Sequence, residues 1–249
     1  MTEALDPLVY SPKLLHYTRG LDILRLHKYG NQGLPCSPRL HRIQSDRSLS
    51  MATSNDYSFS LTLPEWAIVE NKNLKPTYQT VEDRMREVLR FARRNTEEQT
   101  GGPFAAGVFE LDTGRPIVVG VNRVMPHLCS SAHAEVVALS LAQKQLQTFD
   151  LGAPNVPAHQ LVVNWRPCAM CYGATIWSGI TSLVIAGAGS KVEDITGFDE
   201  GPLRDNWQEE LEQRGISVTV GVLHEEALAG LRYFANSGAL IYNARQGPS

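Results

Sequence analysis

The chain has 249 residues, of which 43% are hydrophobic and 20% are charged, as is ordinary for a globular protein. It has no run of 18 or more apolar residues and no apolar segment after the N-terminus, so we expect neither a membrane span nor a secretory signal. The formal net charge is −3; residues 1–56 contribute +2 and the remainder −5, and an acidic domain is a poor match for nucleic-acid phosphates.

Cysteine usage favours a cytoplasmic location. The chain has only four cysteines, at positions 36, 129, 168 and 171, and a secreted disulfide framework would be denser. In a reducing compartment, a close pair such as Cys168 and Cys171 more often binds a metal or carries redox chemistry.

Residues 1–56 show no sustained period of 2 or 3.6 and are rich in Gly, Pro, Ser and Asn. We therefore expect a disordered N-terminal extension that precedes a folded domain of residues 57–249. The acid-poor, Arg- and Ser-containing middle of the extension also suggests an organelle transit peptide, although Glu3 and Asp6 fit that poorly. A third interpretation is a leader that precedes a start at Met51.

The first part of the folded domain predicts a helix, a hairpin and a second helix. Thr80 and Asp83 resemble a capping box, and apolar residues follow at helical spacing. Strands over 104–111 and 116–124 flank a turn at residues 112–114. A helix is expected from about Ala132 to Gln147, with Ser130 and Ser131 as N-cap candidates.

The remainder alternates strands and helices. We expect strands at 159–165, 181–188 and 216–223, and helices from Pro167 or Cys168 to Ser178, over 204–215 ending at Gly215, and over 224–236. This order predicts an α/β fold: a three-layer α-β-α sandwich with a mixed sheet of about five strands.

Two helix starts carry the residues of a predicted zinc site. His133, Cys168 and Cys171 supply three ligands, the number that a catalytic zinc takes when its fourth position holds water. Cys-x-x-Cys in a first helical turn places both sulfurs at one helix end, where the helix dipole stabilises thiolates. His133 and Glu135 lie about 200° apart around a helix, so they can converge only beyond its tip.

The predicted cofactor is therefore Zn²⁺, reached end-on by both helices. Zinc lowers the pKa of water from about 15.7 to about 7, which corresponds to roughly 12 kcal/mol at neutral pH. Glu135 would then carry the water proton to the substrate ring and the leaving amine.

The pattern His-x-Glu followed by Pro-Cys-x-x-Cys is typical of zinc deaminases. The segments "GGPFAAGVFELDTG", "GVNRVMPH", "SSAHAEVVALSLAQ", "RPCAMCYGATIWSGI" and "GFDEGP" resemble the bacterial guanine and ammeline deaminases of the cytidine-deaminase-like superfamily, over about residues 80–245. The resemblance implies the cytidine-deaminase-like fold. It also implies zinc-dependent hydrolytic deamination of a free purine base. The first expected substrate is guanine, which would give xanthine and ammonia, and the second is ammeline.

The resemblance also implies residue roles. Asn122 would hydrogen-bond the purine, Ala134 would contact it through its backbone, and Glu200 would help Glu135 to pass protons. Without the resemblance, Glu200 would be taken for a solvated turn residue.

Phe104 and Trp177 would pack around the base, although both also suit an ordinary core. The family further implies a homodimer that exchanges C-terminal segments, with Tyr242 a candidate to close the neighbour's site. The expected partner is thus a small nucleobase, with neither nucleic acid nor membrane.

Two features leave alternatives open. Arg166 stands where the family usually has Glu before Pro-Cys. Because arginine accepts no hydrogen bond, any bond that the Glu accepts is lost or replaced here, and the substrate range or oligomer contacts of this protein can differ from those of the family. Cys129 is expected to be a small buried residue, with an alternative zinc-ligand role, and His127 a loop residue. The rival functions are a guanosine, cytosine or tRNA adenosine deaminase, and a non-catalytic zinc-binding pseudo-deaminase, against which the intact Glu135 argues.

Overall fold

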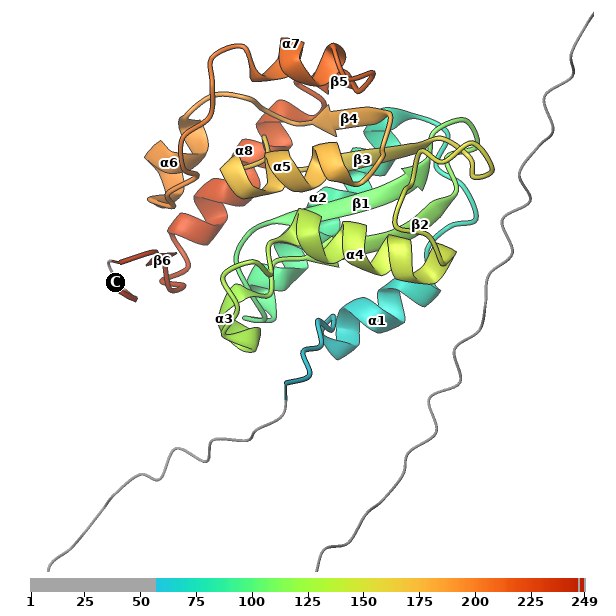
Figure 1. The fold of residues 1–249 in the computed structure, drawn as a ribbon. Helices are drawn as coiled ribbons and strands as arrows, with labels where there is room; N and C mark the ends of the chain where they lie inside the picture. Colours follow the sequence, from blue (N-terminus) through green and yellow to red (C-terminus); the bar gives the residue numbers. More distant parts are fainter. Residues whose placement is uncertain (1–56, 246, 249) are drawn as a thin grey trace, which may run out of the picture. The chain divides into compact units, whose positions relative to one another are not determined.

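The structure, a computed structural model, describes residues 57–245 and 247–248. The predicted N-terminal extension, residues 1–56, lies outside the described residues. The described chain is built on a five-stranded sheet with the order β2-β1-β3-β4-β5 (Figure 1). The strands are β1 (Ala105–Glu110), β2 (Pro116–Val121), β3 (His159–Val163), β4 (Ser182–Ile185) and β5 (Ser217–Val220).

The sheet is mixed, as predicted. β1 pairs antiparallel with β2 through the expected hairpin and antiparallel with β3, whereas β3, β4 and β5 run parallel to one another. All residues of β1, β3 and β4 are buried. These strands therefore need cover on both faces, which explains their continuous apolar sequence.

Helices supply that cover on both faces and complete the predicted three-layer α/β sandwich (Figure 1). One face carries α2 (Val81–Glu97) and α8 (His224–Ala235), and the other carries α4 (Ala134–Leu146) and α5 (Ala169–Trp177). On the first face, the core includes Met85, Val88, Phe91, Val119, Val162, Leu228 and Leu231. On the second face, it includes Val108, Ala138, Leu139, Ala142, Leu161 and Leu183.

The starts of the helices differ in detail from the prediction. Thr80 caps α2 as expected, because its Oγ1 accepts a hydrogen bond of 3.1 Å from the Asp83 N–H, an interaction worth about 1 kcal/mol. In contrast, α4 begins at Ala134 rather than Ala132, and α5 begins at Ala169 rather than at Pro167 or Cys168. The residues expected in the first turns, His133 and Cys168, are instead the N-caps.

Several short elements were not predicted. They are α1 (Glu65–Lys72), α3 (Val124–His127), α6 (Lys191–Thr196), β6 (Tyr242–Asn243) and β7 (Gly247–Pro248). In addition, α7 (Trp207–Glu212) is shorter than the predicted helix, which was expected to run to Gly215. Elements of two to eight residues are too short to establish a hydrophobic period, so their sequences carry little signal.

Gly120 of β2 allows α4 to lie unusually close to the sheet. A Cβ atom at this position would lie 2.7 Å from the Ala138 nitrogen and 3.0 Å from the Ala134 carbonyl oxygen. Carbon atoms in contact normally lie about 3.5–4.0 Å apart. Only glycine therefore fits here, and it positions the first turn of α4 directly.

No helix within residues 57–245 and 247–248 combines the length and the apolar character needed to cross a membrane.

Candidate active site

The two helix starts bring the three predicted zinc ligands together. His133 and Cys168 are the N-cap residues of α4 and α5, and both have extended backbone (φ −67°, ψ 156° and φ −68°, ψ 172°). Each side chain therefore lies just outside its helix rather than on its flank. Cys171 follows in the first turn of α5, and its N–H donates to the Cys168 sulfur at 3.5 Å.

The geometry of the donors suits a zinc ion. The ligand atoms of His133, Cys168 and Cys171 all lie within 4.8 Å of one another, and His133 Nδ1 is 3.5 Å from Cys168 Sγ. Zinc bonds of about 2.3 Å to sulfur and about 2.0 Å to nitrogen at a tetrahedral angle require a separation of about 3.6 Å. One imidazole and two thiols are also the donor types that zinc prefers. The residues present thus fit the metal.

Cys129 lies outside this cluster. Its sulfur is 3.2 Å from the Ser131 hydroxyl, and its side chain is half-buried. It is absent from the one group of three metal-binding side chains found in the described part of the chain. The structure therefore gives no support to Cys129 as an alternative ligand.

The two cysteines differ in acidity. Hydrogen bonding from Cys171, together with His133, lowers the pKa of Cys168 to about 4 against the opposing effect of burial. Hydrogen bonding to Cys168 and burial raise the pKa of Cys171. Because zinc binds thiolates, metal binding would favour the deprotonated form of both residues.

Two buried carboxyl groups accompany the ligands. Glu135, in the first turn of α4, is 5% exposed, and burial raises its pKa, as does the nearby charge of Cys168. Glu200 is 9% exposed, and burial raises its pKa to about 8, with contributions in the same direction from Cys168 and Glu135. Carboxyl groups with raised pKa values can hold and release protons near neutral pH.

A cavity of about 290 Å³ opens onto this cluster. Of the predicted site residues, those that line it are Phe104, Asn122, His133, Cys168, Glu200 and Tyr242. Ala134, Glu135 and Cys171 are buried beside the cavity lining rather than part of it. The volume lies at the lower end of ligand pockets, so the cavity suits a small ligand.

Trp177 does not belong to this cavity, which corrects the expectation that it packs around the base. It is the last residue of α5, about 12 Å along the helix axis from Ala169, and its side chain is 86% exposed. Within a single chain, Trp177 therefore cannot contact a ligand held near Cys168.

Aromatic side chains form one wall of the cavity. Phe104 and Phe198 have ring centroids 5.6 Å apart, and Phe198 also meets Tyr242 edge-on at 5.1 Å and Phe234 at 5.5 Å. Phe198 was not predicted as a site residue, although it lies in the segment "GFDEGP" that carried the resemblance. Its position beside Glu200 in the sequence was the available signal.

Asn122 is held firmly at the cavity edge. Its Oδ1 accepts hydrogen bonds from the Tyr242 hydroxyl at 2.9 Å, from the Val124 N–H at 3.3 Å and from the Gly102 N–H at 3.4 Å. Burial raises the pKa of Tyr242, so its hydroxyl stays protonated and able to donate. The Asn95 side chain also donates to the Asn122 carbonyl oxygen at 3.1 Å.

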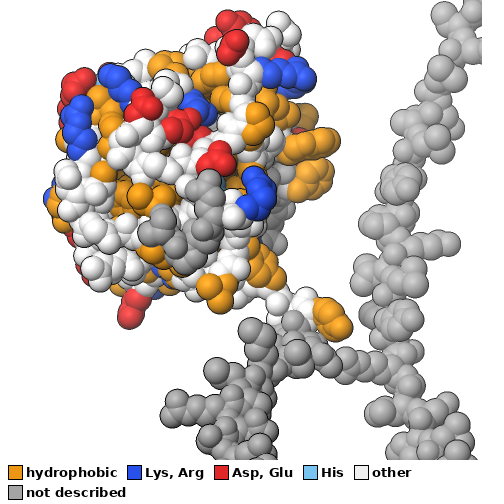
Figure 2. Space-filling model, turned by 90° about the vertical axis from the view of Figure 1, so that its left-hand side faces the viewer, with side chains coloured by type: hydrophobic (Ala, Val, Ile, Leu, Met, Phe, Trp, Pro, Cys, Tyr) orange, Lys and Arg blue, Asp and Glu red, His pale blue; other side chains and the backbone are white. Residues whose placement is uncertain are grey.

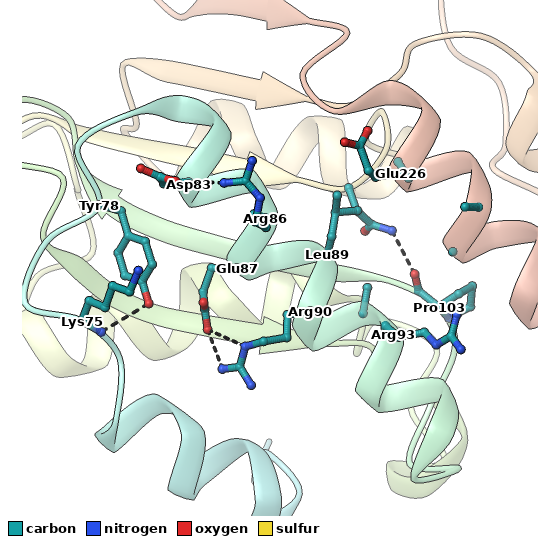
Figure 3. Close-up of a pocket in the computed structure, with 15 residues that line it drawn as sticks. Lys75, Tyr78, Asp83, Arg86, Glu87, Leu89, Arg90, Arg93, Pro103 and Glu226 are labelled. Carbon is teal, nitrogen blue, oxygen red and sulfur yellow. Dashed lines mark hydrogen bonds and ion pairs between the residues drawn. The ribbon is translucent and has the colours of Figure 1, made fainter.

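A larger cavity of about 570 Å³ lies between α2 and α8 (Figure 3). Two ion pairs lie among its charged side chains, one between Arg86 and Asp83 and one between Arg90 and Glu87. None of the sequence-predicted site residues lines it. We therefore assign the chemistry to the smaller cavity.

Comparison with known proteins extends these observations. Residues 78–187 match the family described as the cytidine and deoxycytidylate deaminase zinc-binding region. The solved structure of guanine deaminase from Nitrosomonas europaea is 48% identical to the chain, covers 72% of it and 96% of that protein, and has a TM-score of 0.68.

Two curated proteins of Bacillus subtilis are more distant. Guanine deaminase is 30% identical over 138 residues, which are 55% of this chain and 83% of that protein. A tRNA-specific adenosine deaminase is 30% identical over 142 residues, which are 57% of this chain and 80% of that protein.

Proposed function

The chain belongs to the zinc-binding deaminase family, whose members are hydrolytic enzymes, and from that premise we propose that it deaminates a free purine base. The first candidate substrate is guanine, and its products would be xanthine and ammonia. The observation that carries this proposal is the set of His133, Cys168, Cys171 and Glu135 beside a small cavity, in a chain 48% identical to a guanine deaminase. Ammeline is the second candidate substrate.

In the proposed mechanism, His133, Cys168 and Cys171 would hold the metal beside the cavity. When bound, zinc supplies the Lewis acidity that makes water a nucleophile at neutral pH. Glu135 accepts the proton of the attacking water and delivers it to a ring nitrogen. The water oxygen bonds to C2 of guanine. Glu200 passes the second proton of that water to the amino group on C2, and the C2–N bond breaks so that this group departs as ammonia.

The rest of the cavity would hold the base. We assign hydrogen bonding to Asn122, a backbone contact to Ala134, and stacking to Phe104, supported by Phe198. Tyr242 closes the cavity edge through its hydrogen bond to Asn122. In a homodimer with exchanged C-terminal segments, which we also propose, the same contact would come from the neighbouring chain.

The tRNA deaminase alternative fits the site less well. The cavity of about 290 Å³ is small, and acidic side chains intersperse the basic ones on the described face in Figure 2. Nucleic-acid binding usually relies on a continuous basic surface. The similarity to a tRNA-specific adenosine deaminase, at 30% identity, is lower than that to the Nitrosomonas guanine deaminase. We therefore propose a small nucleobase as the partner.

The non-catalytic alternative is also disfavoured. Glu135 is present and buried beside the ligand cluster, and the set has three protein ligands rather than four. Cytoplasmic location remains a proposal, supported by the free thiols of the three cysteines in the described residues.

The test is ammonia release from guanine, ammeline, guanosine, cytosine and a tRNA anticodon stem-loop by zinc-loaded protein. We expect guanine to be the best substrate and Glu135→Gln to keep its zinc while losing about 10²- to 10⁴-fold in kcat. Glu82→Gln is the matched control, because Glu82 is also in a first helical turn but is exposed. Absence of ammonia from guanine would remove the substrate proposal, and an active Glu135→Gln would remove the mechanism.

A further inference from the structure

Arg166, the unexpected residue before Pro167 and Cys168, has a specific partner. Its side chain is only 10% exposed, and its Nη2 donates to Oε1 of Glu193 on α6 in a close ion pair. Arg166 Nη1 and Glu193 Oε2 are buried and have no hydrogen-bond partner among the described residues. Each side chain therefore depends on this one contact, because a buried charge without its partner is strongly unfavourable.

The partner helix leads directly into the cavity. α6 ends at Thr196, its C-cap Gly197 has the left-handed conformation (φ 78°), and Phe198 and Glu200 follow within three residues of that glycine. Both side chains line the cavity. Any movement of α6 relative to the metal-binding segment would therefore move Phe198 and Glu200 as well.

Two further contacts hold the loop after α6, and both are made by uncharged groups. The Glu200 carbonyl oxygen accepts a hydrogen bond of 3.0 Å from the Ala169 N–H. The Asn243 side chain donates to the Gly197 carbonyl oxygen at 3.0 Å and accepts from the Asp199 N–H at 2.9 Å. The first contact holds the loop to the start of α5, and the second holds it to the C-terminal segment.

We propose that Arg166 is a positioning residue: its ion pair with Glu193 fixes α6 against the segment that ends at Cys168, and thereby fixes the Glu200 carboxyl group beside the metal ligands. The guanidinium is suited to this role because it is rigid and always charged. Its charge also acts on Glu200, since it opposes the larger effects that raise the pKa of that carboxyl group. The catalytic part of this inference rests on the proposed function.

The test begins with a measurement that needs no substrate. In zinc-loaded Arg166→Gln, hydrogen–deuterium exchange over residues 197–203 should be at least several-fold faster than in the wild-type protein. Exchange over the β1–β2 hairpin should be unchanged. Glu193→Ala breaks the same pair from the more exposed side and should give the same result if Arg166→Gln folds poorly. Arg115→Gln is the matched control, because it removes the ion pair with Glu110 at the far end of β1.

The second readout is a double-mutant cycle with guanine. Arg166→Gln should lower kcat about ten- to hundred-fold, with KM within about two-fold and full zinc content. In the Glu200→Gln background, the same substitution should lower kcat no further, whereas a merely structural effect would add. Unchanged exchange over 197–203, or additive losses in the cycle, would overturn the proposal. If the wild-type protein does not deaminate guanine, the proposed function fails, and the exchange data alone decide the positioning role.

Discussion

Replacing Gly120 by alanine tests how closely the structure places α4 against the sheet. The new methyl group would lie 2.7 Å from the Ala138 nitrogen and 3.0 Å from both the Ala134 oxygen and the Ala138 Cα. Because normal contacts are about 3.5–4.0 Å, α4 would have to move by about 1 Å. Overpacking of this kind costs about 1–3 kcal/mol, while loss of the glycine entropy returns about 0.5–1 kcal/mol. From the midpoints of these two ranges, we expect a net destabilisation of about 1 kcal/mol.

The catalytic effect should exceed the effect on stability, because Ala134 adjoins both His133 and Glu135. A displacement of 1 Å can cost about 10²-fold in rate. The assays are the urea midpoint at unchanged m-value and kcat/KM for guanine. Gly230→Ala is the control, since a Cβ there meets nothing within 4 Å and α8 should gain about 1 kcal/mol. A Gly120→Ala protein with wild-type stability or wild-type turnover would refute the reasoning.

Three further predictions concern the metal, pH and the cavity edge. Chelation of zinc should lower the melting temperature, and added zinc should restore it, because the buried thiolate of Cys168 loses its partner; a melt insensitive to chelator would contradict the site. Hydrogen bonds from Arg115 and Thr113 lower the pKa of Glu110. The contribution of ionised Glu110 to the stability of the folded protein should therefore be present above about pH 4.3 and disappear as the pH falls through the lower folded-state pKa. Glu110→Gln should flatten this part of the curve of urea midpoint against pH. Tyr242→Phe removes a hydrogen bond worth about 0.5–1.5 kcal/mol, so KM for guanine should rise about two- to ten-fold, and an unchanged KM would show that the contact to Asn122 does not serve binding.

The sequence predicted the long elements and the metal ligands for the same physical reason: both depend on short-range patterns. α2, α4 and α8 show helical periods, and the central strands are continuous apolar runs between turn residues. Cys168 and Cys171 share one helix start, and His133 adjoins Glu135. Each of these pairs stays close in any fold that keeps its helix, whereas the approach of His133 to Cys168, 35 residues apart, depends on the fold.

The contacts that were missed join segments far apart in the chain. Arg166 and Glu193 are 27 residues apart, one in a loop and the other in a short helix without a clear period. Trp177 is a different case: it lies at the end of α5 away from Cys168 and outside the cavity of its own chain, so a contact with the base would require a neighbouring chain. From the sequence, Arg166 indicates only a change in substrate range or oligomer contacts, and the fold supplies its partner, Glu193.

The bonding of Asn122 has a consequence for molecular discrimination. Two of the three groups that its oxygen accepts from are backbone amides, which can only donate, so the carboxamide cannot be turned around without facing donor to donor. Its NH₂ group is therefore the end left to donate a hydrogen bond to a ligand in the cavity, and that ligand must present an acceptor. One edge of guanine offers two, at N7 and O6, whereas adenine replaces the second with an amino group. A single amide of fixed polarity would thus select a ligand that presents a hydrogen-bond acceptor at this edge, without any charged residue.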